Sequence, residues 1–276
     1  MIPQRNISLL SNRLAKSGGR RFREDVLERD YCLAWFLVAL AESDLKAALA
    51  FKGGTALKRC YFSDYRFSED LDFTLLEPLT IDDLLRRLES VYSIVRERSG
   101  ITFAFERSDH QKHLNSHTFY LKYIGPLPGD NDVKVDVTIR EQIAYPLQAR
   151  PILRGYEEFA DLPVGQPLKV YSLDEILAEK TIALADRARN EPRDLYDLWH
   201  LTSNARIDLA AQTEAIRQKL AFRTKPFEGI VDAIQNKEAR LRALWTGRLA
   251  NQMSTLPEFD EVFRVVRRTL RQADLP

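Results

Sequence analysis

The amino-acid sequence predicts an α+β protein, in which a mixed-sheet domain with N-terminal helices is followed by an all-helical C-terminal region. The sheet domain opens with a β-α-β succession: a strand at 49–51, a Gly-Gly-Thr turn leading into a helix, and a strand near 71–76. Three later stretches alternate apolar and polar residues as half-buried strands do, near 101–107, 117–124 and 132–140. Strands that follow one another directly argue against a purely parallel, doubly wound sheet.

Two segments in the first part of the chain predict long helices. Residues 20–49 contain no proline, and their pattern is first amphipathic and then continuously apolar. In 80–98, apolar residues including Leu84, Leu88 and Val91 recur with the helical period of about 3.6 residues. Both segments are therefore expected to pack against the sheet.

Glycine and proline mark the connections. The segment 125–131 contains two glycines and two prolines between two predicted strands, which indicates a hairpin connection. The segment 151–167 is also punctuated by proline and glycine and predicts a linker, and from Ser172 onward the pattern is almost entirely helical. We therefore predict two domains, residues 1–165 and residues 166–276.

The composition is that of an ordinary folded protein. The chain has 276 residues, of which 45% are hydrophobic and 29% charged, and its formal net charge is +1. A charge this small gives no overall attraction to nucleic acid, but basic residues gather near both termini: Arg13, Lys16, Arg20, Arg21 and Arg23 at one, and Arg264, Arg267, Arg268 and Arg271 at the other. Such clusters suit a phosphate backbone, and they equally suit the solvated face of a helix.

The cysteines and the apolar segments indicate a cytoplasmic protein without a membrane segment. Cys32 and Cys60 both lie among apolar residues, so they are expected to be core residues rather than a disulfide. The longest apolar run, residues 31–41, is much shorter than the roughly 20 residues that span a bilayer. Nothing at the N-terminus has the pattern of a secretory signal.

The most informative motif joins a glycine turn to a pair of acids. In Gly53-Gly54-Thr55, glycine allows a sharp bend in which backbone N–H groups can close on an anion. Asp70 and Asp72 are two residues apart, so on a strand they project from the same face. Two carboxylates beside a phosphate-sized turn are the ligands that a Mg²⁺–triphosphate requires.

A third acid has the same strand pattern. Val133, Val135 and Val137 alternate with polar residues, so Asp136 is expected to leave the polar face of its own strand. Three carboxylates of this kind predict a nucleotidyl-transfer site with metal ligands Asp70, Asp72 and Asp136. Ser68 precedes Asp70 by two residues, and its hydroxyl would share that face if the strand began early.

Two residues in the helical region carry charge at the edge of an apolar face. Lys180 occupies a position where the helical period calls for an apolar residue, so it either covers a core edge with its stem or binds an anion. Asp194 lies at the margin of the next buried face, where it either reaches a neighbouring site or interacts with its own helix N-terminus. Arg193 and Asp197 are expected to point away and to pair with each other, or Asp197 to lock two helices together.

Other catalytic patterns are weak or missing. His110, His113 and His117 have a spacing that suits zinc, but they lack cysteine or carboxylate support and are interpreted as part of a solvated connection. The sequence has neither a Gly-rich dinucleotide motif nor a Walker lysine motif.

Taken together, these motifs resemble the DNA polymerase β-like nucleotidyltransferase superfamily. More narrowly, the segments 51–57, 66–73, 173–180 and 192–198 are similar to the AbiEii/AbiGii toxin family, including its MenT-like members. The resemblance covers most of residues 45–200, and the four motifs in this order are specific to the family.

The resemblance implies an NTP-dependent nucleotidyltransferase toxin that uses Mg²⁺, with Mn²⁺ as an alternative. It implies a cognate antitoxin, a role in phage defence or growth arrest, and an RNA acceptor, most directly the 3′ end of tRNA. By the family's motifs Asp70 and Asp72 hold metal with Asp136 as the third acid, and Lys180 and Asp194 are further catalytic residues. The nucleotide-binding residues that the resemblance implies are Gly53, Gly54, Thr55, Lys58, Arg66 and Ser68.

The sequence leaves two alternatives open. The acceptor can be a protein or small-molecule hydroxyl, because acceptor choice depends on loops and on the helical region. Alternatively, the chain is a non-catalytic module that binds nucleotide.

Overall fold

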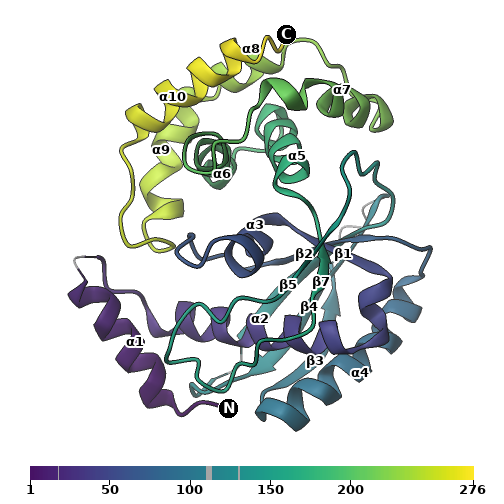
Figure 1. Ribbon diagram of the computed structural model, residues 1–276, viewed down its shortest axis with the longest axis vertical. Coiled ribbons are helices and arrows are strands. Elements are labelled where there is room, and N and C mark those ends of the chain that lie inside the picture. Colours follow the sequence, from purple (N-terminus) through teal and green to yellow (C-terminus); the bar gives the residue numbers. More distant parts are fainter. Residues whose placement is uncertain (18, 110–113, 130) are drawn as a thin grey trace. The chain divides into compact units, whose positions relative to one another are not determined.

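The computed structural model describes residues 1–17, 19–109, 114–129 and 131–276 (Figure 1). The expected zinc candidates His110 and His113 lie outside these residues. The chain forms two compact units: unit 1 comprises residues 1–140 and 147–170, and unit 2 comprises residues 141–146 and 171–276. In the described part of the chain, no helix is long and apolar enough to cross a membrane.

Unit 1 is built on a mixed sheet. Its described strands, in the spatial order β3-β4-β5-β2-β1-β7-β6, are β3 (Thr102–Ser108), β4 (Ser116–Ile124), β5 (Asn131–Thr138), β2 (Leu71–Leu75), β1 (Leu49–Lys52), β7 (Leu168–Val170) and β6 (Gln148–Arg150). Two neighbouring pairs, β2 with β5 and β1 with β7, are parallel, and the other pairs are antiparallel. The predicted mixed sheet is confirmed, and so is the hairpin between β4 and β5.

The helices of unit 1 bury their apolar sides in one core with this sheet. These are α1 (Gln4–Lys16), α2 (Glu24–Glu42) and α4 (Ile81–Ser99), and Figure 1 shows α2 and α4 beside the strands. The continuous apolar run of α2 is buried throughout, and its Phe36 ring lies 5.3 Å from Phe103 of β3. Thr80 caps α4 by accepting a hydrogen bond from the Asp83 N–H, and Gly100 ends it in the left-handed conformation that favours glycine.

Two short strands flank the segment predicted as a linker. Within 151–167 the chain is irregular as expected, but β6 and β7 flank it, and β7 pairs with β1. Each has only three residues, too few for a period-two pattern to stand out. They extend the sheet beyond the β-α-β start.

Unit 2 is helical, apart from its entry segment. Its helices are α5 (Leu173–Ala185), α6 (Pro192–Ser203), α7 (Thr213–Phe222), α8 (Ile230–Gln235), α9 (Glu238–Leu249) and α10 (Phe259–Gln272). Ser172 caps α5 by accepting from the Glu175 N–H, and Pro192 occupies the first turn of α6, where it has no N–H to leave unpaired.

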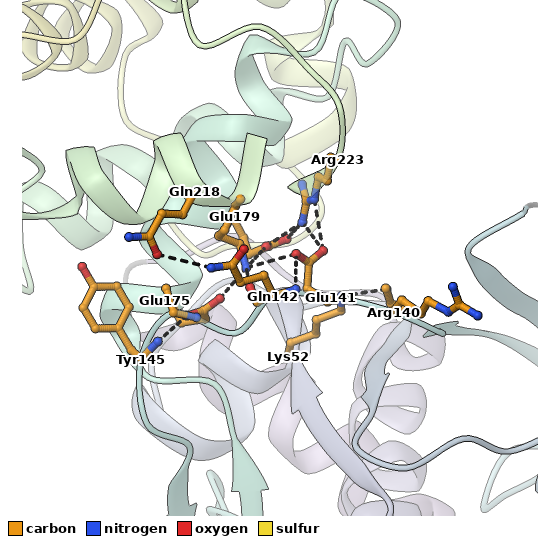
Figure 2. A network of polar contacts seen from close by, with 12 residues as sticks. Lys52, Arg140, Glu141, Gln142, Tyr145, Glu175, Glu179, Gln218 and Arg223 are labelled. Atoms are coloured by element: carbon orange, nitrogen blue, oxygen red, sulfur yellow. Dashed lines mark hydrogen bonds and ion pairs between the residues drawn. The ribbon is translucent and has the colours of Figure 1, made fainter. Parts of the chain in front are cut away.

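A short strap, residues 141–146, is held in unit 2 by buried ions (Figure 2). Glu175 accepts hydrogen bonds from the N–H groups of Ala144 and Tyr145, at 2.8 and 2.9 Å. The ammonium of Lys219, which is fully buried, binds Glu175 and the carbonyl of Gln142. The chain thus leaves unit 1 after residue 140, contributes the strap to unit 2, and continues in unit 1 from residue 147.

Candidate functional site

Four side-chain positions form a row across the sheet of unit 1. Lys52 of β1 is the register partner of Asp72, Asp72 is the partner of Asp136, and Asp136 is the partner of Thr118 on β4. Register partners project from the same face, so both acids leave the face opposite to the buried Phe73 and Val137. The sequence prediction that Asp72 and Asp136 lie on polar strand faces is confirmed.

The carboxylate of Asp136 has partners on its own face of the sheet. Thr118 donates a hydrogen bond to Asp136 Oδ1 at 2.8 Å, and the Lys134 ammonium donates to Oδ2 at 3.0 Å. Burial opposes the charge on Lys134, but the Asp136 hydrogen bond and the charges of Asp136, Asp70 and Asp72 outweigh it and raise the Lys134 pKa. The three predicted acids therefore act together on one lysine, Lys134, which no sequence motif marks.

The two glycines of the turn leave room for the side chains of this site. Gly53 has φ +80°, and a Cβ there would lie 2.2 Å from Asp72 Oδ2. A Cβ on Gly54 would lie 2.8 Å from Arg66 Nη2 and 3.0 Å from Ser68 Oγ. The glycines thus bring the backbone of the turn against one of the acids and two predicted nucleotide-binding residues.

Thr55 holds the backbone of the acidic segment. It is buried in α3 (Gly53–Ala56), and its hydroxyl donates a hydrogen bond to the carbonyl oxygen of Asp70. Asp70 precedes the first residue of β2, so this bond ties the start of the strand to the helix. In this structure Thr55 positions Asp70, a role that its place in the motif did not reveal.

Lys58 and Arg66 are more buried than a sequence-based prediction of phosphate contact suggests. Lys58 lies in η2 (Leu57–Tyr61), the π-helical continuation of α3, and donates hydrogen bonds to the Ser63 carbonyl and to the Tyr156 hydroxyl. Burial lowers its pKa to about 8. Arg66 is 2% exposed and donates to the Phe67 carbonyl at 3.2 Å.

In unit 2, Lys180 and Asp194 belong to one buried ionic cluster. The Lys180 ammonium lies 2.9 Å from Asp194 Oδ1 and 2.7 Å from Asp197 Oδ2, joining α5 to α6. Asp197 is fully buried, so the expectation that it points away with Arg193 was wrong, and the alternative, a lock between helices, is confirmed. Its place three residues after Asp194 puts both acids on one face of α6.

Arg189 is the fourth member of this cluster and was missed in the sequence. Its Nε donates to Asp194 Oδ2 at 2.5 Å, and its Nη2 lies 3.4 Å from Oδ1. Burial would raise the pKa of Asp194, but the charges of Lys180 and Arg189 outweigh it and hold that pKa below its ordinary value. Arg189 stands in a loop between helices, where no periodicity marks a residue as significant.

The predicted site residues thus fall into two groups. Unit 1 holds the glycine turn, the three acids, Lys58, Arg66 and Ser68, and unit 2 holds Lys180 and Asp194. Hard carboxylate oxygens on one sheet face have the donor chemistry that Mg²⁺ prefers. Within the described ranges, however, no three His, Cys, Asp or Glu side chains stand together as a complete metal site. A metal held by Asp136 would share this carboxylate with Thr118 and Lys134, each of which donates to one of its oxygens.

Comparison with known proteins agrees with the fold and with the motifs. The profile of the family described as nucleotidyl transferase AbiEii toxin, type IV TA system, matches residues 35–265. Among curated proteins, no sequence matches. One similar solved structure is the nucleotidyltransferase toxin MenT4 of Mycobacterium tuberculosis H37Rv, with 19% identity and a TM-score of 0.66 over 98% of this chain and 90% of that chain. The chain therefore belongs to the AbiEii family of nucleotidyltransferase toxins of type IV toxin–antitoxin systems.

Proposed function

We propose that this toxin uses a divalent metal, Mg²⁺ or in its place Mn²⁺, to transfer nucleotides from an NTP to RNA, with the 3′ end of tRNA as the acceptor. The observation that carries the proposal is the row of Asp72 and Asp136 on neighbouring parallel strands, with Gly53 against Asp72. A nucleotidyltransferase needs anionic ligands for metal and a turn that accommodates phosphate, and these are adjacent within unit 1.

The metal would be held by Asp70, Asp72 and Asp136. Bound there, it would neutralise phosphate charge and align the attacking hydroxyl with the α-phosphorus. The acceptor oxygen forms the new bond to the α-phosphorus, the bond to the bridging oxygen of the β-phosphate breaks, and pyrophosphate leaves. Asp136 would receive the hydroxyl proton.

The nucleotide would be bound by backbone N–H groups at Gly53 and Gly54, with Ser68 beside the turn. Thr55 would act through the position of Asp70, as its hydrogen bond suggests. From unit 2, we assign Lys180 and Asp194 to the same reaction, since their motifs are those of the family.

An RNA acceptor is supported by exposed basic residues. Arg264, Arg268 and Arg271 are exposed along α10, and Arg20 and Arg21 are exposed before α2. Arginine binds phosphate through a planar array of donors, which suits an RNA backbone. By contrast, Arg13 pairs with Glu158 and Arg23 with Asp25, so the N-terminal cluster is partly neutralised.

The cellular setting follows from the family. A type IV toxin–antitoxin system includes an antitoxin, and we propose that it restrains this enzyme in the cytoplasm until phage infection or stress. Cys32 and Cys60 are both buried and form no disulfide, which suits a reducing compartment.

The experiment is to incubate the protein with each NTP, Mg²⁺ and cellular RNA, and then to sequence the RNA 3′ ends. We expect added nucleotides on tRNA, and none with the Asp72→Asn variant. Unextended RNA together with nucleotide attached to a protein or a small hydroxyl compound would contradict the choice of acceptor. Absence of any pyrophosphate release would contradict catalysis.

A further inference from the structure

We propose that a polar pocket of unit 2, lined in part by Arg206 and Arg268, binds a phosphate of the RNA backbone. The inference rests on the proposed function, because it assumes an RNA acceptor. Every residue of the lining belongs to unit 2. Arg206 lies outside the basic clusters near the two termini, so the sequence alone did not mark it.

The pocket lies where the loop after α6 meets α10. Its volume is about 450 Å³, and its lining comes from within residues 202–210 and 265–273. Seven of the twelve lining residues have polar side chains, although the buried Leu209 and Ala273 also take part. Pockets for drug-sized small molecules are lined predominantly by apolar side chains. This lining therefore favours a charged ligand.

The pocket gathers hydrogen-bond donors that the protein does not use. Across the described ranges, the side chains of Arg206 and Arg268 make no hydrogen bond, ion pair or ring contact. The Ser203 hydroxyl and the Gln272 amide, also in the lining, have no partner among the described residues either. Guanidinium, hydroxyl and amide groups can all donate, and a phosphate oxygen can only accept. The set suits a phosphate.

Asp208 is the acid of this lining, and it is engaged by its own loop. Its Oδ1 accepts a hydrogen bond from the Ala210 N–H at 3.0 Å, at the start of the 3₁₀ turn η3 (Ala210–Gln212). In the part of the chain that the structure describes, Asp208 forms no ion pair with Arg206 or Arg268. The two arginines thus leave the lining with an excess of positive charge, which attracts anions into a concave surface.

The backbone at Arg206 indicates that its side chain is used. Arg206 has φ 56°, in the left-handed region where a Cβ is strained and glycine is not. Glycine would occupy this position after α6 at lower cost. Residues held in such conformations gather at ligand-binding and active sites, where the side chain compensates for the strain.

A polymer of phosphates fits the surroundings of the pocket better than a single phosphate does. Arg264, Arg268 and Arg271 are exposed and follow one another by four and three residues, so they share one face of α10. Arg268 belongs both to this row and to the pocket. An RNA strand that follows the row therefore brings one of its phosphates to Arg206.

The test measures binding of a fluorescein-labelled tRNA transcript by fluorescence anisotropy at several salt concentrations. The variants of the full chain are Arg206→Gln, Arg206→Gly, Arg268→Gln and the double variant Arg206→Gln/Arg268→Gln. Arg248→Gln is the matched control: Arg248 is exposed in the last turn of α9, has no partner within the described ranges, and lies outside the lining.

Three further measurements identify the ligand and the state of the fold. Isothermal titration with a non-hydrolysable NTP analogue and Mg²⁺ gives the affinity for free nucleotide. Labelled poly-L-glutamate reports on an acidic protein partner. The melting temperature of each variant shows whether the fold has changed.

Each arginine-to-glutamine change should lower the slope of log affinity against log salt by about 0.7–0.9, which is about five- to eightfold in affinity at 0.1 M salt. The double variant should lose both contributions. Arg206→Gly should bind RNA as weakly as Arg206→Gln with an equal or higher melting temperature, because glycine relieves the left-handed backbone. Arg248→Gln, and analogue binding in every variant, should stay within about twofold of the wild type.

Four results would overturn the inference. The first is RNA binding by Arg206→Gln and Arg268→Gln that equals that of Arg248→Gln. The second is a lower melting temperature of Arg206→Gly, which would assign this arginine to the fold. The third is weaker analogue binding with unchanged RNA binding, which would assign the pocket to free nucleotide. The fourth is weaker poly-L-glutamate binding with unchanged RNA binding, which would assign it to an acidic protein.

The wild-type protein separates this inference from the proposed function. If it neither binds the tRNA transcript nor extends RNA, the RNA acceptor is refuted together with the pocket. If it binds and extends RNA while the variants match the control, the pocket alone is refuted.

Discussion

The contact between Gly53 and Asp72 gives a quantitative prediction. In Gly53→Ala, the new Cβ would lie 2.2 Å from Asp72 Oδ2, 2.9 Å from its Cγ and 3.0 Å from its Cβ, so rotation of the carboxylate alone does not relieve the contact. Alanine at φ +80° adds a backbone cost of about 1–2 kcal/mol. We therefore expect lower stability and a displaced Asp72.

Gly100→Ala is the matched control for this variant. Gly100 has φ +78° in the same unit, but a Cβ there would meet only Met1 Cβ at 3.9 Å, an ordinary contact. Both variants should lose about 1–2 kcal/mol of unfolding free energy through the backbone. Only Gly53→Ala should also lose metal affinity, by about 10–100-fold, the usual effect of disturbing the support of a metal ligand.

The assay combines urea unfolding with Mn²⁺ titration and nucleotide transfer. If Gly53→Ala binds Mn²⁺ and transfers nucleotide within twofold of Gly100→Ala, a margin on the order of assay scatter, then the turn does not position Asp72 for metal. That result would leave Gly53 with a role only at the start of the helix.

Three further predictions follow from single contacts. Asp72→Asn should abolish transfer without lowering the melting temperature in metal-free buffer, because it relieves repulsion between neighbouring carboxylates; retained transfer would refute the metal assignment. Lys180→Met should lose about 3–5 kcal/mol in urea unfolding, since it leaves two buried aspartates with one cation fewer. Lys225→Met, which removes a half-exposed pair with Asp186, should lose only about 0–1 kcal/mol, and equal losses would contradict the buried role. Finally, the pKa of Lys58 is about 8 in the folded protein against 10.5 in the unfolded chain, so the folded protein binds fewer protons between these two pH values. The unfolding free energy of the wild type should therefore rise with pH through that window relative to Lys58→Met, by about 3 kcal/mol at most. Parallel curves of stability against pH for the two proteins would show that Lys58 titrates normally.

Periodic features were predictable from the sequence. The alternation of Val133, Val135 and Val137 fixed which face of β5 carries Asp136, and the same rule placed Asp72 on β2. The helical period located α4 to within a residue or two of its ends, Ile81 and Ser99. Mixed pairing followed from the order of strands along the chain.

Contacts made by long side chains were not predictable. Lys58 and Arg66 stand where phosphate ligands are expected, yet both side chains are buried among aromatic rings, with the Lys58 ammonium 4.8 Å from the Phe67 ring centre. Lys134 and Arg189 contact acids of the two groups from positions that no motif marks. Such positions depend on rotamers and on loop geometry, which a single sequence does not encode in its periodicity.

The most direct test of nucleotidyl transfer follows the α-phosphate and the γ-phosphate of the NTP separately. The protein is incubated with RNA, Mg²⁺ and NTP labelled either at the α-phosphate or at the γ-phosphate, with Asp72→Asn as the inactive control. Nucleotidyl transfer predicts that the α-label enters the RNA 3′ end and that the γ-label is released as pyrophosphate. Entry of the γ-label into RNA or protein, or release of inorganic phosphate alone, would contradict it.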